Sequence, residues 1–121
     1  MIVNRLIALD MPASKTFADQ VRNAWESGDA VFPIDQRLPQ TAKDSLISQF
    51  KPSLIIDETG NTVNLKGADP TSSNDALIIA TSGSTGTPKG VVHTHDSIQA
   101  LLNMSQAHMN TDSSTHWLLC L

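Results

Sequence analysis

The side chains best suited to chemistry lie together in residues 81–90. This segment reads Thr-Ser-Gly-Ser-Thr-Gly-Thr-Pro-Lys-Gly, and it combines three glycines, five hydroxyl side chains and one lysine with no carboxylate. Glycine lets backbone N–H groups approach an anion closely. Hydroxyl groups donate further hydrogen bonds, and Lys89 adds a positive charge. Apolar runs at 76–80 and 91–92 flank the segment. The pattern therefore predicts a loop between two strands that binds a polyanion.

Three other interpretations of residues 81–90 compete with this one. A flexible Ser/Gly connector is the plainest, but linkers rarely place Pro-Lys-Gly against an apolar pair. A Walker-type loop needs a lysine followed by Ser or Thr at the start of a helix, whereas Gly90 and two valines follow Lys89. The glycines at 83 and 86 do not make the dinucleotide signature G-x-G-x-x-G either.

Residues 81–90 resemble the signature phosphate loop of the AMP-forming adenylate-forming enzymes. This family includes acyl- and aryl-CoA ligases, peptide-synthetase adenylation domains and luciferases. Its pattern T-S-G-S/T-T-G-x-P-K-G is matched here at every fixed position. Residues 24–35 are similar to an earlier segment of the family, with Ser27 and Asp29 as variants, and His93-Thr-His95 is similar to the usual continuation. The resemblance covers about residues 17–121.

The resemblance implies a two-step reaction and a role for each loop residue. A carboxylic acid is activated with ATP to acyl-AMP, and a thiol then displaces AMP. Coenzyme A is the expected thiol, as in the compact bacterial acid–CoA ligases, a group to which the o-succinylbenzoate ligases belong. Mg²⁺ would bridge the phosphates through a carboxylate elsewhere, so no metal ligand is assigned in this chain. Lys89 is the implied catalytic residue, and the implied ATP-binding residues are Thr81, Ser82, Gly83, Ser84, Thr85, Gly86, Thr87 and Lys89.

The same resemblance sets an expectation for domain organisation. The Thr-Glu pair for magnesium, the ribose-binding Asp, the hinge and the C-terminal lysine of the family are not found in these residues. We therefore expect residues 1–121 to be an incomplete N-terminal portion of an AMP-binding domain, without the C-terminal lid domain and inactive alone. Two alternatives stay open, namely an adenylation domain that loads a carrier protein and a non-catalytic nucleotide- or phosphate-binding module.

Composition excludes several other classes of function. The formal net charge is −4 and the eight basic residues are scattered, which argues against nucleic-acid binding. Cys120 is the single cysteine, so no intrachain disulfide can form and a reducing cytoplasm is expected. The apolar start of the chain is too short to span a bilayer. Nothing in the sequence sets the oligomeric state.

The elements around the loop predict an α/β fold. Strands are expected at 2–9, 30–35, 53–57, 76–80 and 90–94, with a hairpin arm at 62–65. Helices are expected after caps at Ser14 or Thr16, at Thr41, and at Thr94 or Asp96. This alternation predicts βαβ units and a parallel sheet. Pro33 favours an edge or a strand end for its segment.

The remaining candidate residues are expected to be structural. His93 and His95 would place both rings on one face of a strand, but two ligands do not make a zinc site. Phe17, Trp25 and Trp117 are expected in the core. Residues 116–121 are expected to begin another buried strand, with Cys120 as an inert core thiol.

Overall fold

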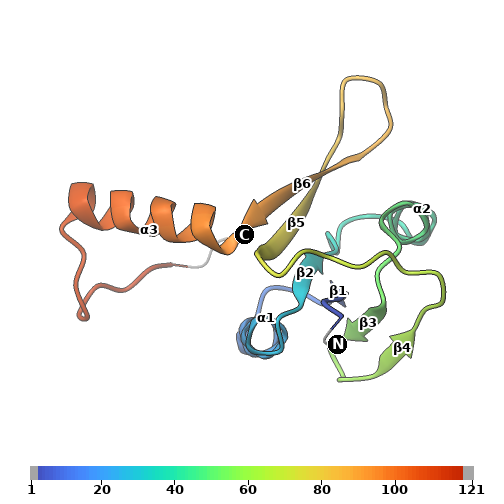
Figure 1. The fold of residues 1–121 in the computed structure, drawn as a ribbon, viewed down its shortest axis with the longest axis horizontal. Coiled ribbons are helices and arrows are strands. Elements are labelled where there is room, and N and C mark those ends of the chain that lie inside the picture. The colour runs from blue at the N-terminus through green and yellow to red at the C-terminus, as the bar shows by residue number, and fades with distance from the viewer. Residues whose placement is uncertain (1–2, 119–121) are drawn as a thin grey trace.

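A six-stranded sheet organises residues 3–118, the part of the chain that this computed structural model describes (Figure 1). The strand order across the sheet is β4-β3-β1-β2-β5-β6. The four inner strands run parallel, whereas β4 and β6 lie antiparallel at the two edges. This arrangement confirms the predicted α/β fold with βαβ units. The strands are β1 (Leu6–Asp10), β2 (Ala30–Pro33), β3 (Leu54–Asp57), β4 (Thr62–Asn64), β5 (Asp75–Thr81) and β6 (Lys89–Thr94).

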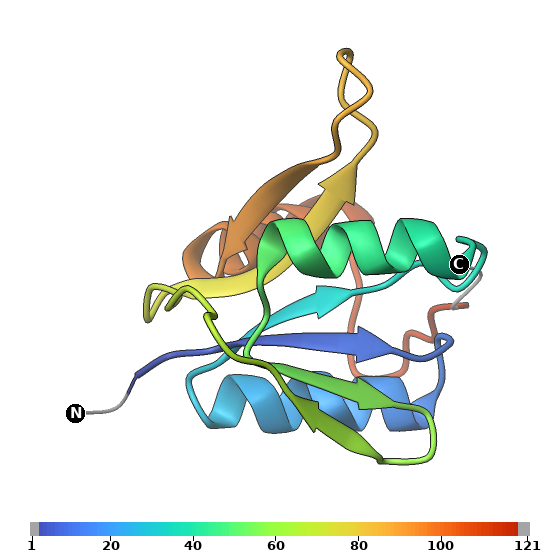
Figure 2. The same ribbon diagram turned by 90° about the vertical axis from the view of Figure 1, so that its right-hand side faces the viewer.

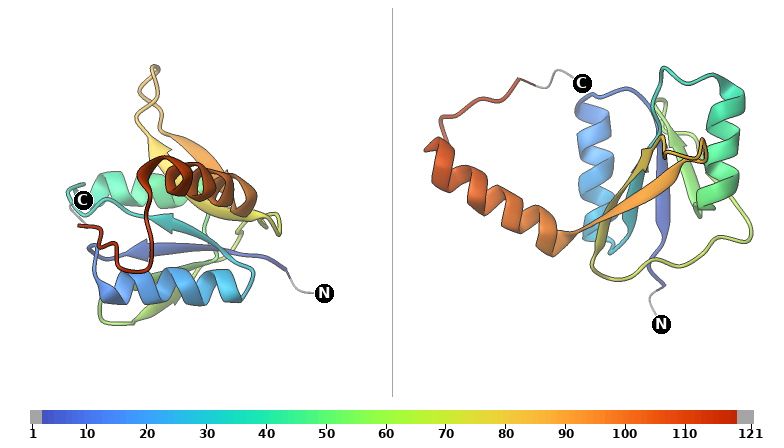
Figure 3. Two further views of the ribbon diagram at one scale, coloured as in Figure 1. Left: turned by 90° about the vertical axis from the view of Figure 1, so that its left-hand side faces the viewer. Right: turned by 90° about the horizontal axis from the view of Figure 1, so that it is seen from above.

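Helices α1 (Lys15–Glu26) and α2 (Gln40–Phe50) cover opposite faces of the sheet (Figures 2 and 3). The two central strands, β1 and β2, are therefore buried on both faces, which explains why they are almost continuously apolar. In β1, Leu6 and Ala8 pack in the cluster beneath α2, while Ile7 and Leu9 pack in the cluster beneath α1. The core consequently lies on both sides of β1 and β2.

Local signals account for most helix ends. The Ser14 hydroxyl accepts a hydrogen bond from the Phe17 N–H at 3.1 Å and caps α1, so Ser14 and not Thr16 is the cap. Thr94 caps α3 (His95–Met109) by accepting from the Ser97 N–H at 3.1 Å. The prediction for Thr41 was wrong, because the cap of α2 lies two residues earlier, at Pro39, and makes no side-chain hydrogen bond.

The prediction for Pro33 is confirmed in one of its two forms, and one other expectation needs correction. Pro33 is the last residue of β2, and β2 lies between β1 and β5. Residues 116–118 form no strand, and the side chains of Trp117 and Leu118 are exposed at 69% and 87%. Cys120 and the rest of that predicted strand lie outside the described residues. Helix α3 extends away from the sheet and buries none of its residues (Figure 1). Among residues 3–118, no helix has both the length and the apolar character that crossing a bilayer requires.

An ion pair between a half-exposed arginine and a buried aspartate connects the residue before β1 to the residue before β2. The Asp29 carboxylate is 3% exposed and accepts from the Arg5 backbone N–H at 2.9 Å. The Arg5 guanidinium also donates to both oxygens of Asp29, at 3.2 Å from Nε and 2.6 Å from Nη2. A bidentate arginine–carboxylate pair of this kind fixes the relative orientation of the two side chains and also pairs their charges. Sequence analysis named Asp29 only as a variant within residues 24–35 and missed this contact.

We expect Asp29→Ala to lower the free energy of unfolding by about 2 kcal/mol, because it removes charge-assisted hydrogen bonds and leaves buried donors without a partner. Urea denaturation of the 121-residue chain measures this. Asp19→Ala is the matched control, since Asp19 pairs with Lys15 and Arg22 on the exposed face of α1, and its loss is expected to be much smaller. Equal losses in the two variants would contradict the structural role given to Asp29.

Candidate functional site

Residues 82–88 form the loop that joins β5 to β6, at the carboxyl end of a parallel strand. The β5–β6 hairpin rises beyond the body of the sheet, and the tip of its loop stands clear of the other elements (Figures 1 and 2). Thr81 pairs with Lys89 across the hairpin, and Thr81 Oγ1 donates to the Lys89 carbonyl oxygen at 3.3 Å. The structure thus brings the first and last predicted site residues side by side and confirms that the loop lies between two strands.

Two glycines shape the loop. Gly83 and Gly86 have positive φ values of 41° and 79°, a conformation that L side chains rarely adopt. The Gly86 N–H donates to the Gly83 carbonyl at 3.4 Å, which closes a turn. A Cβ atom at Gly83 would lie 2.5 Å from the backbone carbonyl oxygen of Thr87, so the two sides of the loop could not approach as they do. Glycine is therefore required at position 83 for two reasons: a side chain would not fit, and the backbone has a positive φ.

The loop presents an open set of hydrogen-bond donors. The side chains of Thr81, Ser82, Ser84, Thr85, Thr87 and Lys89 are all exposed. Among the hydrogen bonds formed within residues 3–118, none involves a hydroxyl group of residues 82–87, and Lys89 forms no ion pair there. The donors and the positive charge are consequently available to an anion. A carboxylate, which would repel an anion or bind a cation instead, is absent from residues 81–90.

Helix α2 supports the exit of the loop. Gln49 Nε2 donates a hydrogen bond to the Pro88 carbonyl, and the ring of Phe50 lies against Gly90. Sequence analysis missed both residues. The contacts join positions about 40 residues apart, and neither the helical spacing of α2 nor the loop composition contains a signal for them.

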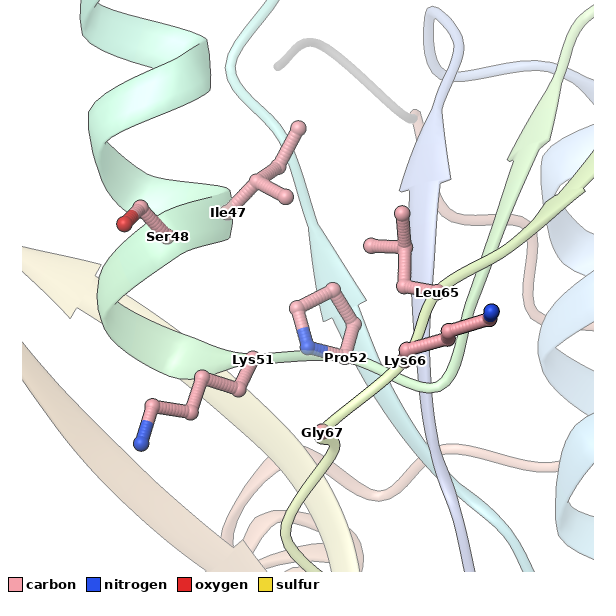
Figure 4. A pocket seen from close by; sticks show the side chains of 7 residues that line it. All are labelled: Ile47, Ser48, Lys51, Pro52, Leu65, Lys66 and Gly67. Atoms are coloured by element: carbon pink, nitrogen blue, oxygen red, sulfur yellow. The ribbon is translucent and has the colours of Figure 1, made fainter.

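The last turn of α2 also lines a groove of about 300 Å³ (Figure 4). Its lining residues are Ile47, Ser48, Lys51, Pro52, Leu65, Lys66 and Gly67. Ile47, Pro52 and Leu65 approach it from three sides, whereas the amines of Lys51 and Lys66 point away from one another (Figure 4). Because its polar groups do not converge, this groove does not compete with residues 81–90 as the candidate site.

The histidines are not a paired site. His93 lies in β6, but His95 begins α3, so the two rings do not share one face of a strand as predicted. The His95 ring instead packs edge-on against Trp25, with ring centroids 5.3 Å apart, and Trp25 Nε1 donates to the Ala76 carbonyl at 2.8 Å. Within residues 3–118 no group of three or more His, Cys, Asp or Glu side chains could hold a metal ion.

A second charged cluster lies at the end of β1 and is neutralised within the fold. Lys43 Nζ contacts Asp10 at 2.8 Å, and Gln36 donates to the same carboxylate at 2.8 Å. Burial acts to raise the pKa of Asp10, but the hydrogen bonds from Lys43 and Gln36 and the charge of Lys43 outweigh it, so the pKa lies below its usual value. This lysine is already paired, in contrast to Lys89.

Comparison with known proteins points to one family. A profile of the family described as AMP-binding enzyme matches residues 14–121. Malonate–CoA ligase of Arabidopsis thaliana is 52% identical over 46 residues, which cover 38% of this chain and 8% of the relative. A protein named as a nonribosomal peptide synthetase, CymA of Salinispora arenicola, is 32% identical over 103 residues, covering 82% of this chain and 1% of the relative.

Solved structures of similar proteins have the same fold as this chain. The o-succinylbenzoate CoA synthetase of Bacillus subtilis, solved with its acyl-adenylate intermediate, superposes with a TM-score of 0.80 over 100% of this chain and 38% of that one. Sequence identity is 13%, so this similarity is evidence of fold alone. The chain spans between 1% and 22% of the length of the curated relatives it matches.

Gly83→Ala is expected to disrupt the loop. The new Cβ would overlap the Thr87 carbonyl, so the turn between Gly83 and Gly86 must open, and amide resonances of residues 82–87 should shift in NMR spectra. Gly60→Ala is the matched control, because Gly60 has a similar φ of 84° in the β3–β4 turn but no atom within 4 Å of the added Cβ. It should cost about 1–2 kcal/mol of stability without moving the loop. An unchanged loop spectrum in Gly83→Ala would refute the steric argument.

Proposed function

This chain belongs to the AMP-binding enzyme family, and we propose that residues 81–90 bind the β- and γ-phosphates of ATP while a carboxylic acid is activated. The observation that carries this proposal is the set of exposed hydroxyls of residues 82–87 and the Lys89 amine, which have no side-chain partner among residues 3–118. They lie on a hairpin that is closed by Thr81 and Lys89. Hard oxygen anions with several acceptor atoms are the ligands that such a donor set suits.

In the proposed first step, a carboxylate oxygen attacks the α-phosphorus of ATP. A new P–O bond forms, and the bond to the β-phosphate breaks with its electron pair on the leaving pyrophosphate. Negative charge therefore grows on the phosphates that the loop holds. Donors fixed in place before the reaction stabilise such charge without reorganisation.

Each loop residue has a role in this proposal. Thr81, Ser82, Ser84, Thr85 and Thr87 donate hydroxyl or backbone N–H groups to phosphate oxygens. Gly83 and Gly86 allow the backbone to approach, and Lys89 neutralises the pyrophosphate as it leaves. Each charge-assisted hydrogen bond contributes about 1.5–3 kcal/mol.

Mg²⁺ and the thiol substrate are not assigned to residues of this chain. The donors of residues 81–90 are hydroxyls, N–H groups and an ammonium, which fit phosphate oxygens and not a metal ion. Mg²⁺ would enter with the nucleotide and neutralise phosphate charge. A cytoplasmic location, for which the single cysteine is the support, is likewise part of the proposal.

For the second step, we favour transfer of the acyl group to coenzyme A. The thiol sulfur attacks the acyl carbonyl carbon, and the bond to AMP breaks. The similarity to malonate–CoA ligase over 46 residues supports this choice. The similarity to a peptide synthetase over 103 residues supports the alternative, in which the acceptor is the thiol of a carrier protein. Residues 1–121 are, in either case, proposed to be the N-terminal portion of an adenylate-forming domain.

We expect Lys89→Ala to weaken the binding of tripolyphosphate to the 121-residue chain by tenfold or more. The substitution removes a charge-assisted hydrogen bond, and each tenfold loss of affinity corresponds to about 1.4 kcal/mol of binding free energy. Isothermal titration calorimetry measures this. Lys66→Ala is the control, because it removes the same charge from an exposed lysine outside the loop, and it should leave the affinity within about twofold. Equal weakening by both variants would mean that net charge alone attracts the anion, and the assignment of Lys89 would fail.

A longer polypeptide that carries this segment should catalyse carboxylate-dependent exchange of pyrophosphate into ATP, and Lys89→Ala should lower the rate strongly. Product analysis with coenzyme A and with a pantetheinylated carrier protein separates the two acceptors. Exchange that is unchanged by Lys89→Ala would remove this residue from the mechanism.

A further inference from the structure

We propose that Gln49 and Phe50, the last two residues of α2, are positioning residues that hold the loop exit and thereby orient Lys89. This inference rests on the function proposed for residues 81–90, which supplies the reason why Lys89 must be oriented. Neither residue is in the loop, and neither is proposed to touch a substrate. Their role follows from two contacts that reach the backbone on either side of Lys89.

The first contact is made by Gln49. Its side chain is exposed, and its Nε2 group donates to the carbonyl oxygen of Pro88. The Pro88 carbonyl and the Lys89 N–H belong to one planar peptide unit. A hydrogen bond that fixes the carbonyl therefore also fixes the direction of the Lys89 N–H. On the other side of that residue, the Lys89 carbonyl accepts from Thr81 Oγ1 at 3.3 Å. Lys89 is thus held by two independent donors.

The second contact is made by Phe50. Its ring packs edge-on against Phe32, with ring centroids 4.9 Å apart, and Phe32 is fully buried in the core. The other side of the Phe50 ring faces Gly90. A Cβ atom at Gly90 would lie 3.4 Å from Phe50 Cε1 and 3.0 Å from Ile78 Cγ2. The absence of a side chain at Gly90 therefore lets β6 begin directly against α2 and the core.

These contacts restrain the exit of the loop, where Lys89 lies. Restraining a binding group before its ligand arrives lowers the entropy lost on binding. In the described chain, α2 makes its hydrogen bond to the loop at Pro88 and not at the hydroxyl-bearing residues 82–85. The support from α2 therefore acts on Lys89 rather than on the hydroxyl groups.

The test compares Gln49→Met with Gln40→Met in the ligand-free 121-residue chain. Methionine keeps an unbranched side chain and a strong helix propensity but cannot donate a hydrogen bond. Gln40 is equally exposed at the other end of α2, where it donates to Asp44 in the same helix at 2.8 Å. We expect Gln49→Met to lower the heteronuclear NOE of the Lys89 amide and neighbouring loop amides. Gln40→Met should leave these values unchanged, and the urea midpoints of the two variants should agree.

Tripolyphosphate titration provides the second measurement. Loss of one neutral hydrogen bond is worth about 0.5–1.5 kcal/mol, which converts to about twofold to twelvefold weaker binding in Gln49→Met. In the wild-type chain, a nuclear Overhauser contact between the Gln49 side-chain amide and Pro88 or Lys89 tests the pairing without any substitution. Together these results would establish Gln49 as a positioning residue.

Three outcomes would overturn the proposal: absence of the wild-type contact, unchanged loop order in Gln49→Met, or equal loosening of the loop in Gln40→Met. A wild-type chain that binds no tripolyphosphate would instead overturn the function proposed for the loop. The ligand-free NOE values would still decide whether Gln49 orders the loop exit, so the two failures are distinguishable.

Discussion

The antiparallel return of β6 onto β5 is the constraint on which the loop at residues 82–88 depends. β5 runs parallel to its inner neighbour β2, and a parallel strand normally continues into a long crossover. Here the chain reverses within residues 82–88 and pairs with the strand it has just left. The reversal concentrates hydroxyl and N–H donors at the carboxyl end of the sheet. It also places Thr81 opposite Lys89.

The rest of the sheet provides a rigid base for this hairpin. β1 and β2 are buried on both faces by α1 and α2, so β5 is aligned on a strand that cannot shift without disturbing two core clusters. The Arg5–Asp29 pair fixes the start of β1 relative to the start of β2. Trp25 connects α1 to β5 through the Ala76 carbonyl. The loop and most of β6 are exposed, whereas β1 and β2, on which β5 is aligned, are packed from both sides.

Much of this organisation could be predicted from local sequence, and the exceptions share a cause. Ser14, Thr94 and residues 81–90 carry short-range signals, namely a hydroxyl before an apolar stripe and a run of glycines and hydroxyls. Pro33 was predicted at an edge or a strand end and lies at a strand end. The choice between the two could not be made from the sequence, because neighbours across a sheet are not encoded in the strand itself. Trp117 follows a local apolar pattern, yet its exposure depends on which partners surround it.

The same reasoning applies to the candidate site. The identity of the loop was visible in ten residues, whereas its support by Gln49 and Phe50 was not, since such contacts exist only after the chain has folded. The close approach of β6 to α2 at Gly90 has a practical consequence for protein engineering. A hairpin carrying residues 81–90 alone, moved to another scaffold, would keep every donor. It would lose the ring of Phe50. In this fold that ring packs against Gly90 and so sets the direction of the neighbouring Lys89.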